Sequence, residues 1–447
     1  MSFRSTSGLQ SICVLALSTC MAPASAWTSV EDESAAWTIS TFGTASLVRT
    51  EGDGVTFLPF GTQPSGARQA WKSDIDSLLG IQARYSVADH ASATLQLTSK
   101  RDASNNYRPD VEWAYLSLEP GHGLTLRGGR FVAPLFAASD TRLLGYANLW
   151  VRPPVDVYTL GMSHVDGADL IWRTSWQDST ALFQLWGGRS RQAFPRSSAS
   201  GLLTNQAVEY EGMAGINLNL QHQGLSLRFA HLRAQQTLIT TQGKPEQGLR
   251  TFGASQSACM GKEALARTTL LCRDLYLGFS ALEARYDVDH APFQFTSIGL
   301  DSEWGAWRLI AESIWLQHQS RIANSRAGYF TLARSMTSIT PYLTFSWHRA
   351  TTKAFSVQVR PEYAQFVKPT LKLYKPAGEE GPQQTTWSLG LRWDARSGWA
   401  LKAQVDRIRP QGTGNGISEL NRVGLVGKNL SRGPAVQIYN LSADFAY

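Results

Sequence analysis

The sequence is poor in charged residues and cysteine and has no long apolar run. Only 17% of its 447 residues are Asp, Glu, Lys or Arg, against about 25% in soluble domains. After the N-terminal segment, no apolar run approaches the roughly 18 residues of a membrane-spanning helix. These shortages exclude coiled coils, disordered tails and polytopic helical membrane proteins. The 38 glycines and the 11% aromatic share favour a large β protein.

Motifs for catalysis and cofactor binding are also missing. The sequence has no Gly-x-Ser-x-Gly elbow, no His-Glu-x-x-His and no phosphate-binding loop ending in Gly-Lys-Ser/Thr. The net charge of +7 is spread along the chain, which does not suit a nucleic-acid surface. We therefore expect no enzyme activity, no cofactor, no metal site and no nucleic-acid partner. A hydrolase site assembled from distant residues stays open as an alternative.

The first 26 residues have the features of a cleaved export signal. Arg4 precedes a short apolar core, and Ala24-Ser25-Ala26 is a small-residue cleavage site. An exported chain favours disulfides, so Cys259 and Cys272 are expected to pair in a surface loop. Two unrelated thiols are the alternative. The rest, 27–447, is expected to form one domain.

Apolar and polar residues alternate with period two throughout that domain. At the C-terminus, Tyr439, Leu441, Ala443, Phe445 and Tyr447 alternate with mostly polar neighbours. Successive side chains of a strand point to opposite faces, so each such segment has one apolar and one polar face. We expect sixteen antiparallel strands, at about 37–49, 77–87, 91–101, 110–119, 123–131, 167–177, 180–190, 209–221, 224–236, 291–302, 305–320, 326–334, 338–350, 384–394, 398–409 and 435–447.

The connections alternate between short turns and longer polar loops. Segments of about ten residues with short turns at one end and long loops at the other are typical of transmembrane β-barrels. The fold class is therefore all-β, with a transmembrane antiparallel barrel of about 16 strands, short periplasmic turns and long extracellular loops, including 237–290. A soluble sandwich with its apolar faces inside is the alternative.

Aromatic residues favour the membrane barrel. Trp and Tyr prefer the bilayer interface, where the ring is half buried and its polar atom is wet. Those expected on apolar, lipid-facing sides include Trp37, Trp113, Tyr115, Trp172, Trp176, Trp387, Trp393, Trp399, Tyr439 and Tyr447.

With these features the chain resembles Gram-negative outer-membrane porins, including a proteobacterial porin-like subfamily. The resemblance rests on the Ile39–Thr44 strand, the alternating 441–447 terminus, and the stretches Glu112–Leu116 and Trp150–Pro154. It implies an assembly signal at Leu441, Phe445 and Tyr447 for the barrel-assembly machinery, although such chains usually end in Phe. It also implies an outer-membrane location and a homotrimer.

In general porins with sixteen strands, the loop after the fifth strand folds into the lumen and narrows it. The matching segment, 132–166, is long, apolar around Trp150 and stiffened by Pro153-Pro154. An outward loop that covers the mouth or contacts a neighbouring subunit is the alternative. The candidate constriction residues are its ionisable groups Asp140, Arg142, Arg152 and Asp156.

The strand phase also predicts which charges line the lumen. At mid-bilayer an Arg or Lys on the lipid side would cost about 2–4 kcal/mol, so deep basic residues should point inward. The predicted pore-lining residues are Arg84, Lys100, Glu112, Arg127, Arg173, Arg228, Glu312, Arg392 and Lys402. Their basic excess predicts a mild preference for anions. The chain is thus expected to be a passive, water-filled channel for small hydrophilic solutes or ions. A solute-specific channel and a structural or adhesive barrel without an open pore are the alternatives.

Overall fold

The computed structural model describes residues 36–52, 55–197, 203–240, 288–320, 322–351, 380–411, 424–427 and 435–447. The expected signal segment, Cys259, Cys272 and most of 237–290 lie outside these ranges. Where the chain is described, no helix has the length and apolar character needed to cross a bilayer.

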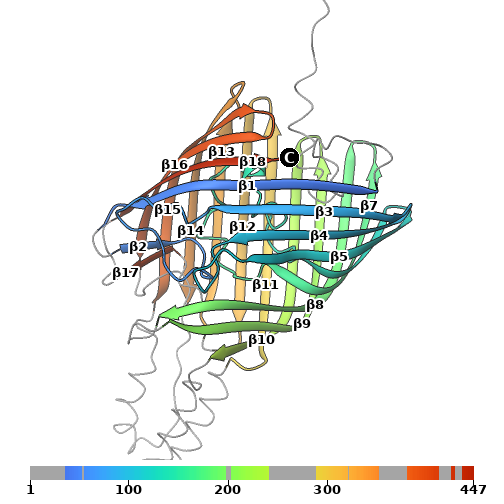
Figure 1. The fold of residues 1–447 in the computed structure, drawn as a ribbon, viewed down its shortest axis with the longest axis horizontal. Helices are drawn as coiled ribbons and strands as arrows, with labels where there is room; N and C mark the ends of the chain where they lie inside the picture. The colour runs from blue at the N-terminus through green and yellow to red at the C-terminus, as the bar shows by residue number, and fades with distance from the viewer. Residues whose placement is uncertain are drawn as a thin grey trace, which may run out of the picture.

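Sixteen antiparallel strands form a closed barrel, as the alternating pattern predicts (Figure 1). The first and last strands pair along the closing seam, with Phe42 opposite Ala446. The barrel strands are β1 (Trp37–Thr50), β3 (Leu78–Ala88), β4 (Ala91–Lys100), β5 (Pro109–Gly121), β6 (Leu124–Val132), β7 (His164–Trp176), β8 (Ser179–Ser197), β9 (Leu203–His222), β10 (Leu225–Thr240), β11 (Ala291–Trp304), β12 (Trp307–His318), β13 (Asn324–Arg334), β14 (Ile339–Thr351), β15 (Glu380–Arg396), β16 (Trp399–Gln411) and β18 (Val436–Ala446).

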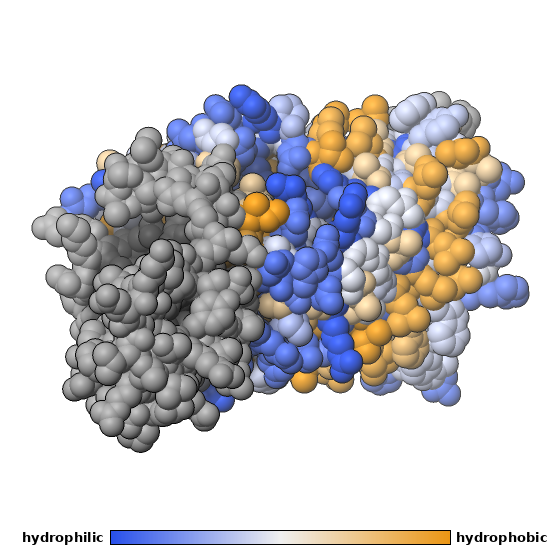
Figure 2. Space-filling model, turned by 90° about the horizontal axis from the view of Figure 1, so that it is seen from below, coloured by the Kyte–Doolittle hydropathy of each residue, from blue (hydrophilic) through white to orange (hydrophobic). Residues whose placement is uncertain are grey.

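The strands extend further at the loop end than the sequence pattern predicts. The expected strands 180–190 and 209–221 are β8 and β9, which pair as far as Ser197 opposite Leu203. The apolar alternation fades there because the wall continues beyond the apolar band as a polar collar. Figure 2 shows this order on one face, with the hydrophobic band at one end and a hydrophilic zone beside it.

The wall has its apolar side chains outside and its polar side chains inside. On β4, Thr94, Gln96 and Thr98 are buried on the inner side, while Leu95 between them is exposed outside. Leu389 and Trp387 of β15 are likewise exposed. This inverts the arrangement of a soluble sandwich and matches a barrel surrounded by lipid.

The predicted assignment of side chains to the inner and outer faces is wrong on β5. Trp113 and Tyr115 were expected on the lipid side, but they lie opposite Gln96 and Thr94, which point inward. A register shift between Gln96 and Leu97 adds a residue on β5, and such a bulge moves all following side chains to the other face. Period two cannot reveal a bulge of one residue.

A small two-stranded sheet was not predicted. It consists of β2 (Val55–Leu58) and β17 (Gly424–Gly427), close to the loop end of the barrel (Figure 1). Phe57 of β2 packs with Val48, Ile75 and Ile438 in a fully buried cluster. The contact explains why Ile438 interrupts the polar face of the last strand.

Candidate functional site

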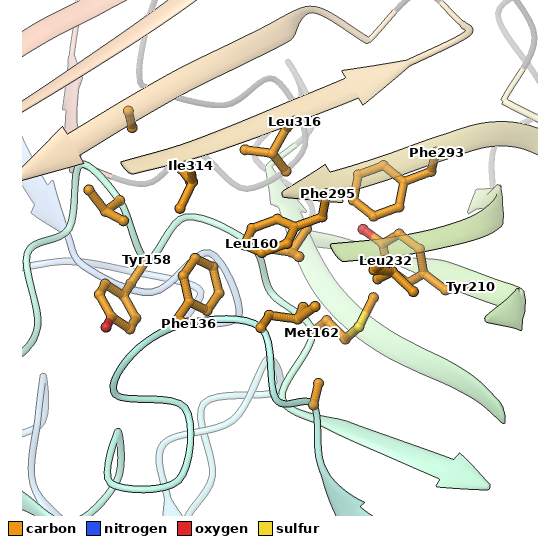
Figure 3. Close-up of a cluster of buried hydrophobic side chains, with 14 of the residues drawn as sticks. Phe136, Tyr158, Leu160, Met162, Tyr210, Leu232, Phe293, Phe295, Ile314 and Leu316 are labelled. Carbon is orange, nitrogen blue, oxygen red and sulfur yellow. The ribbon is translucent and has the colours of Figure 1, made fainter. Parts of the chain in front are cut away.

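The long connection between β6 and β7 crosses the inside of the barrel. We call residues 133–163 the inner loop. Its Phe136 stacks on its Tyr158 with ring centroids 4.6 Å apart and meets Phe295 of β11 edge-on at 5.1 Å. Figure 3 shows these rings beside Leu232 and Ile314 of the inner wall. Burial of the loop's apolar side chains therefore requires an apolar patch on the wall of β10 to β13.

Trp150 fixes the middle of the inner loop to the wall. Its indole Nε1 donates to Thr331 Oγ1 of β13 at 3.0 Å and to Thr344 Oγ1 of β14 at 3.1 Å. Its ring also meets Tyr329 edge-on, with centroids 5.5 Å apart. The indole ring is packed and its one N–H group is hydrogen-bonded, as a buried tryptophan requires.

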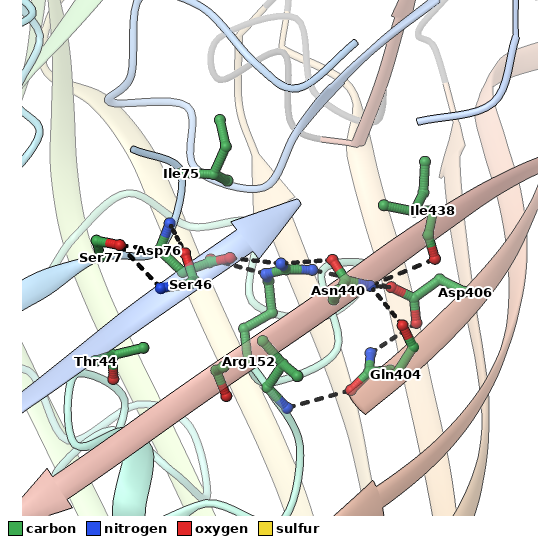
Figure 4. A network of polar contacts seen from close by, with 12 residues as sticks. Thr44, Ser46, Ile75, Asp76, Ser77, Arg152, Gln404, Asp406, Ile438 and Asn440 are labelled. Atoms are coloured by element: carbon green, nitrogen blue, oxygen red, sulfur yellow. Dashed lines mark hydrogen bonds and ion pairs between the residues drawn. The ribbon is translucent and has the colours of Figure 1, made fainter. Parts of the chain in front are cut away.

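Arg152 ties the inner loop to a second inward segment. We call residues 51–77 the mouth segment. Arg152 Nε and Nη2 donate to the Asp76 carboxylate at 2.8 and 2.5 Å, and Nη2 also donates to Asn440 Oδ1 of β18 at 2.7 Å (Figure 4). Both ionic side chains are only 5% exposed. Burial alone would lower the pKa of Arg152, but the carboxylates of Asp76 and Asp406 hold that pKa above its usual value.

Lys402 of β16 fixes the same loop from the wall. Its Nζ donates to the backbone carbonyls of Gly145 and Trp150 at 2.6 and 2.9 Å and lies 3.0 Å from Asp444 Oδ2. The Lys402 and Asp444 side chains are 0% exposed. The lysine therefore stabilises the loop and has no contact with bulk water.

Asp156 is buried against β14 and β15. Its carboxylate accepts hydrogen bonds from Ser346 and from Gln384, each at 2.5 Å. Burial raises the pKa of Asp156, and these donors offset part of the rise. Asp156 thus belongs to the attachment of the loop and is not exposed to the lumen.

Three further predicted pore-lining residues hold the inner loop. Arg228 donates to the Pro134 carbonyl at 3.0 Å. Arg392 donates to the carbonyls of Tyr146 and Asn148 at 2.6 and 2.8 Å. Glu312 accepts from the Ala137 amide at 2.8 Å and from the Tyr158 hydroxyl at 3.0 Å.

The remaining predicted wall residues lie on β3 to β7. Arg84 and Lys100 have side chains 23% and 32% exposed, and Arg127 is 16% exposed. Each has a carboxylate partner, namely Glu119, Glu112 and Asp169 respectively. Arg173, the fourth basic residue of this group, is half-buried, and Glu112, its one predicted acidic residue, is buried.

Asp140 and Arg142 are two half-buried ionisable residues of the inner loop. Desolvation raises the pKa of Asp140, while the positive charges of Arg228 and Arg127 lower it. Desolvation lowers the pKa of Arg142. The predicted residues thus divide into a loop-holding set and a partly exposed basic set.

The residues predicted to form the assembly signal, Leu441, Phe445 and Tyr447, lie at the closing seam. Leu441 is exposed on the outer face, and Phe445 of β18 pairs with Trp399 of β16. The Tyr447 amide donates to the Thr41 carbonyl at 2.7 Å. Cys259 and Cys272 lie outside the described residues.

The sequence pattern missed the mouth segment and its partners. Asp76 has no periodic signal, and Gln404 and Asn440 are uncharged members of the inner face. Gln404 accepts from the Val151 amide at 3.2 Å, and Asn440 accepts from Arg152. One signal in the sequence was available: Ile438 is an apolar residue on the otherwise polar inner face of the last strand, which indicates that another segment packs inside the loop end of the barrel. Within the described ranges, no three His, Cys, Asp or Glu side chains gather as a metal site would require.

No protein-family model and no curated protein matches the sequence. Among solved structures, the outer membrane channel DcaP of Acinetobacter baumannii aligns with a TM-score of 0.52 at 8% identity, over 92% of this chain and 97% of that one. The chain has a porin-type fold. The alignment spans nearly the whole of both proteins, and the fold-level resemblance expected from the sequence is confirmed.

Two other porin-type structures align over similar lengths. OmpT of Vibrio cholerae matches with a TM-score of 0.49 at 9% identity, over 93% of this chain and 99% of that one. The anion-selective porin from Comamonas acidovorans matches with a TM-score of 0.49 at 8% identity, over 92% and 100%.

Proposed function

We propose that this porin-type barrel is an outer-membrane channel for passive diffusion of small hydrophilic solutes or ions, with a mild preference for anions. The observation that carries the proposal is the division of the inner wall. The inner loop is held against β10 to β16, β18 and β1, whereas the partly exposed basic side chains Arg84, Lys100, Arg127 and Arg173 lie on β3 to β7.

The inner loop would act as the constriction. Because it is attached on one side, solutes would pass between the loop and the basic wall. Fixed charges in a narrow lumen select ions by their local potential, so four basic side chains favour anions. The carboxylates Glu112, Glu119 and Asp169 beside them reduce this potential, which limits the preference. Such transport needs no cofactor and no catalytic group.

Single-channel recording in planar bilayers tests the proposal. With a salt gradient across the bilayer, the reversal potential should indicate anion preference. Arg84→Glu together with Arg127→Glu should move it toward cations. The control Arg191→Glu changes an outward arginine and should leave it unchanged. An unchanged reversal potential in the double variant would contradict the lumen assignment.

A barrel without an open pore is the second candidate. The favouring observation is that the inner loop and the mouth segment are interlocked through Arg152 and Asp76. Absence of conductance from correctly inserted protein would support this candidate. Conductance that saturates with one solute would instead support a solute-specific channel.

Export, assembly and oligomeric state form the rest of the proposal. Residues 1–26 would be cleaved on export, and Leu441, Phe445 and Tyr447 would be read by the barrel-assembly machinery. A homotrimer follows from the porin resemblance. N-terminal sequencing of the membrane-inserted protein and native mass spectrometry in mild detergent test the cleavage and the trimer. A retained N-terminus or a monomer would contradict them.

A further inference from the structure

The bulge on β5 turns two aromatic rings toward the inside of the barrel, where passage of small ions does not require them. Trp113 and Tyr115 lie opposite Gln96 and Thr94, whose side chains point inward. Both aromatic side chains are only half-buried. An aromatic ring in a water-filled lumen keeps apolar area in contact with water, and a solute that covers this area gains binding free energy.

Glu112 is the extra residue of this bulge, and its contacts hold the bulge in place. Its carboxylate accepts a hydrogen bond from Thr98 Oγ1 at 3.2 Å and forms an ion pair with Lys100 Nζ. Only 4% of the Glu112 side chain is exposed. Bulges redirect side chains and are common beside functional sites. The buried Glu112 therefore fixes the inward direction of the next residue, Trp113.

A cationic side chain lies at each end of the two rings. At the end nearer the loops, Lys100 is paired with Glu112, the residue directly before Trp113. At the other end, the Arg127 guanidinium lies over the Tyr115 ring, 5.2 Å from its centroid. Two residues of strand span only about 7 Å, so the two rings are neighbours on the inner face of β5. We call Lys100, Trp113, Tyr115 and Arg127 the β5 track.

The Arg127 guanidinium is held in one orientation by its neighbours. Asp169 accepts hydrogen bonds from its Nε at 3.0 and 3.2 Å and from its Nη2. The rings of Tyr115 and Phe131 lie against it, with centroids 5.2 and 5.3 Å away. The side chain nevertheless stays 16% exposed. A carboxylate in the lumen therefore meets an oriented cation, which reduces the entropy cost of binding.

We propose that the β5 track binds aromatic carboxylates as they pass through the channel. The flat ring of the solute stacks on Trp113 and Tyr115, and its carboxylate pairs with Lys100 or Arg127. An inorganic anion uses only the cations of the track, and a neutral ring uses only its aromatic surface. A solute with both a ring and a carboxylate uses both. The inference deepens the proposed function and rests on an open lumen.

Saturation-transfer NMR on the full-length protein in detergent tests the track. The probes are benzoate, acetate, which keeps the carboxylate without the ring, and benzyl alcohol, which keeps the ring without the charge. The wild type should bind benzoate more tightly than either of the other two. This comparison uses the wild type alone, so it decides the matter even if a variant fails to fold.

Substitutions of Trp113 separate stacking from a structural role. Trp113→Leu should raise the Kd for benzoate about fivefold, because one aromatic contact is lost, and should leave the Kd for acetate unchanged. Trp113→Phe keeps a ring and should retain most of the benzoate affinity. The matched control is Trp387→Leu, which removes a tryptophan exposed on the outer face of β15 and should bind benzoate like the wild type.

Unchanged benzoate affinity in Trp113→Leu would overturn the proposal. Acetate or benzyl alcohol binding as tightly as benzoate, or an equal loss in the Trp387→Leu control, would do the same. Chloride conductance in planar bilayers, recorded on the same preparations, tests the channel separately. A wild type that conducts chloride but does not bind benzoate contradicts the β5 track alone. A wild type that binds benzoate but does not conduct contradicts the channel and leaves the track as a binding site.

Discussion

Loss of the Arg152 guanidinium should weaken the barrel more than loss of any exposed arginine. In the Arg152→Met variant the stem of the side chain is largely kept, while the charge and its donors disappear. Asp76 would then lose both hydrogen bonds and stay buried without a cation. Asn440 would lose a donor, and Phe57 would lose the guanidinium, which lies 5.2 Å from its ring centroid.

The expected loss follows from this burial. Removing one partner of a buried ion pair costs about 3–5 kcal/mol, because the other charge remains uncompensated. At 5% exposure, water can do little to screen the Asp76 carboxylate. Adding Asp76→Asn should recover a large part of the loss, since the buried charge is then gone. An exposed pair contributes about 0–1 kcal/mol, so Arg191→Met, at 65% side-chain exposure, is the control.

Urea unfolding in detergent micelles, followed by tryptophan fluorescence, measures these free energies. We expect a clear fall in midpoint for Arg152→Met and partial recovery in the double variant. A loss no larger than that of the Arg191 control, or no recovery with Asp76→Asn, would refute the reasoning. Channel recordings should also become noisier, because the inner loop loses its link to the mouth segment.

Three more outcomes are expected. The Asp156 carboxyl has a pKa raised by burial, so its protonated form contributes stability below the unfolded pKa of about 4. That stability is lost as pH rises through the folded pKa. The urea midpoint of Asp156→Asn should therefore rise relative to that of the wild type between pH 4 and pH 8. A difference between the two midpoints that stays constant with pH would contradict this. Trp150→Ala should cost about 3–5 kcal/mol by the same assay, because a buried indole and its hydrogen bonds are removed, and a loss below 1 kcal/mol would count against it. A thiol introduced at Gly414→Cys should be labelled on intact cells and one at Ala395→Cys should be protected, and the reverse result would invert the topology.

Alternation predicts the strands, and together with the turn pattern and the aromatic residues it predicts the barrel. Each strand needs one face for lipid and one for the interior. This requirement involves only neighbouring residues, so the alternation of apolar and polar residues within β4 or β15 is enough to show it. The charge of Arg84 or Lys402 indicates the inner face for the same reason. The bulge on β5 is the exception, since one inserted residue reverses the face of Tyr115 without changing the composition.

The division of roles among inward residues depends on the tertiary structure. Arg127 and Lys402 have the same strand phase and the same sign of charge, yet one is partly exposed and the other holds backbone carbonyls of the inner loop. Only the three-dimensional structure, in which the Arg152 side chain contacts the Asp76 carboxylate, identifies Asp76 as the partner of Arg152. Strand periodicity determines which face a side chain occupies, but contacts between segments 76 residues apart or more depend on how the loops fold back into the closed wall.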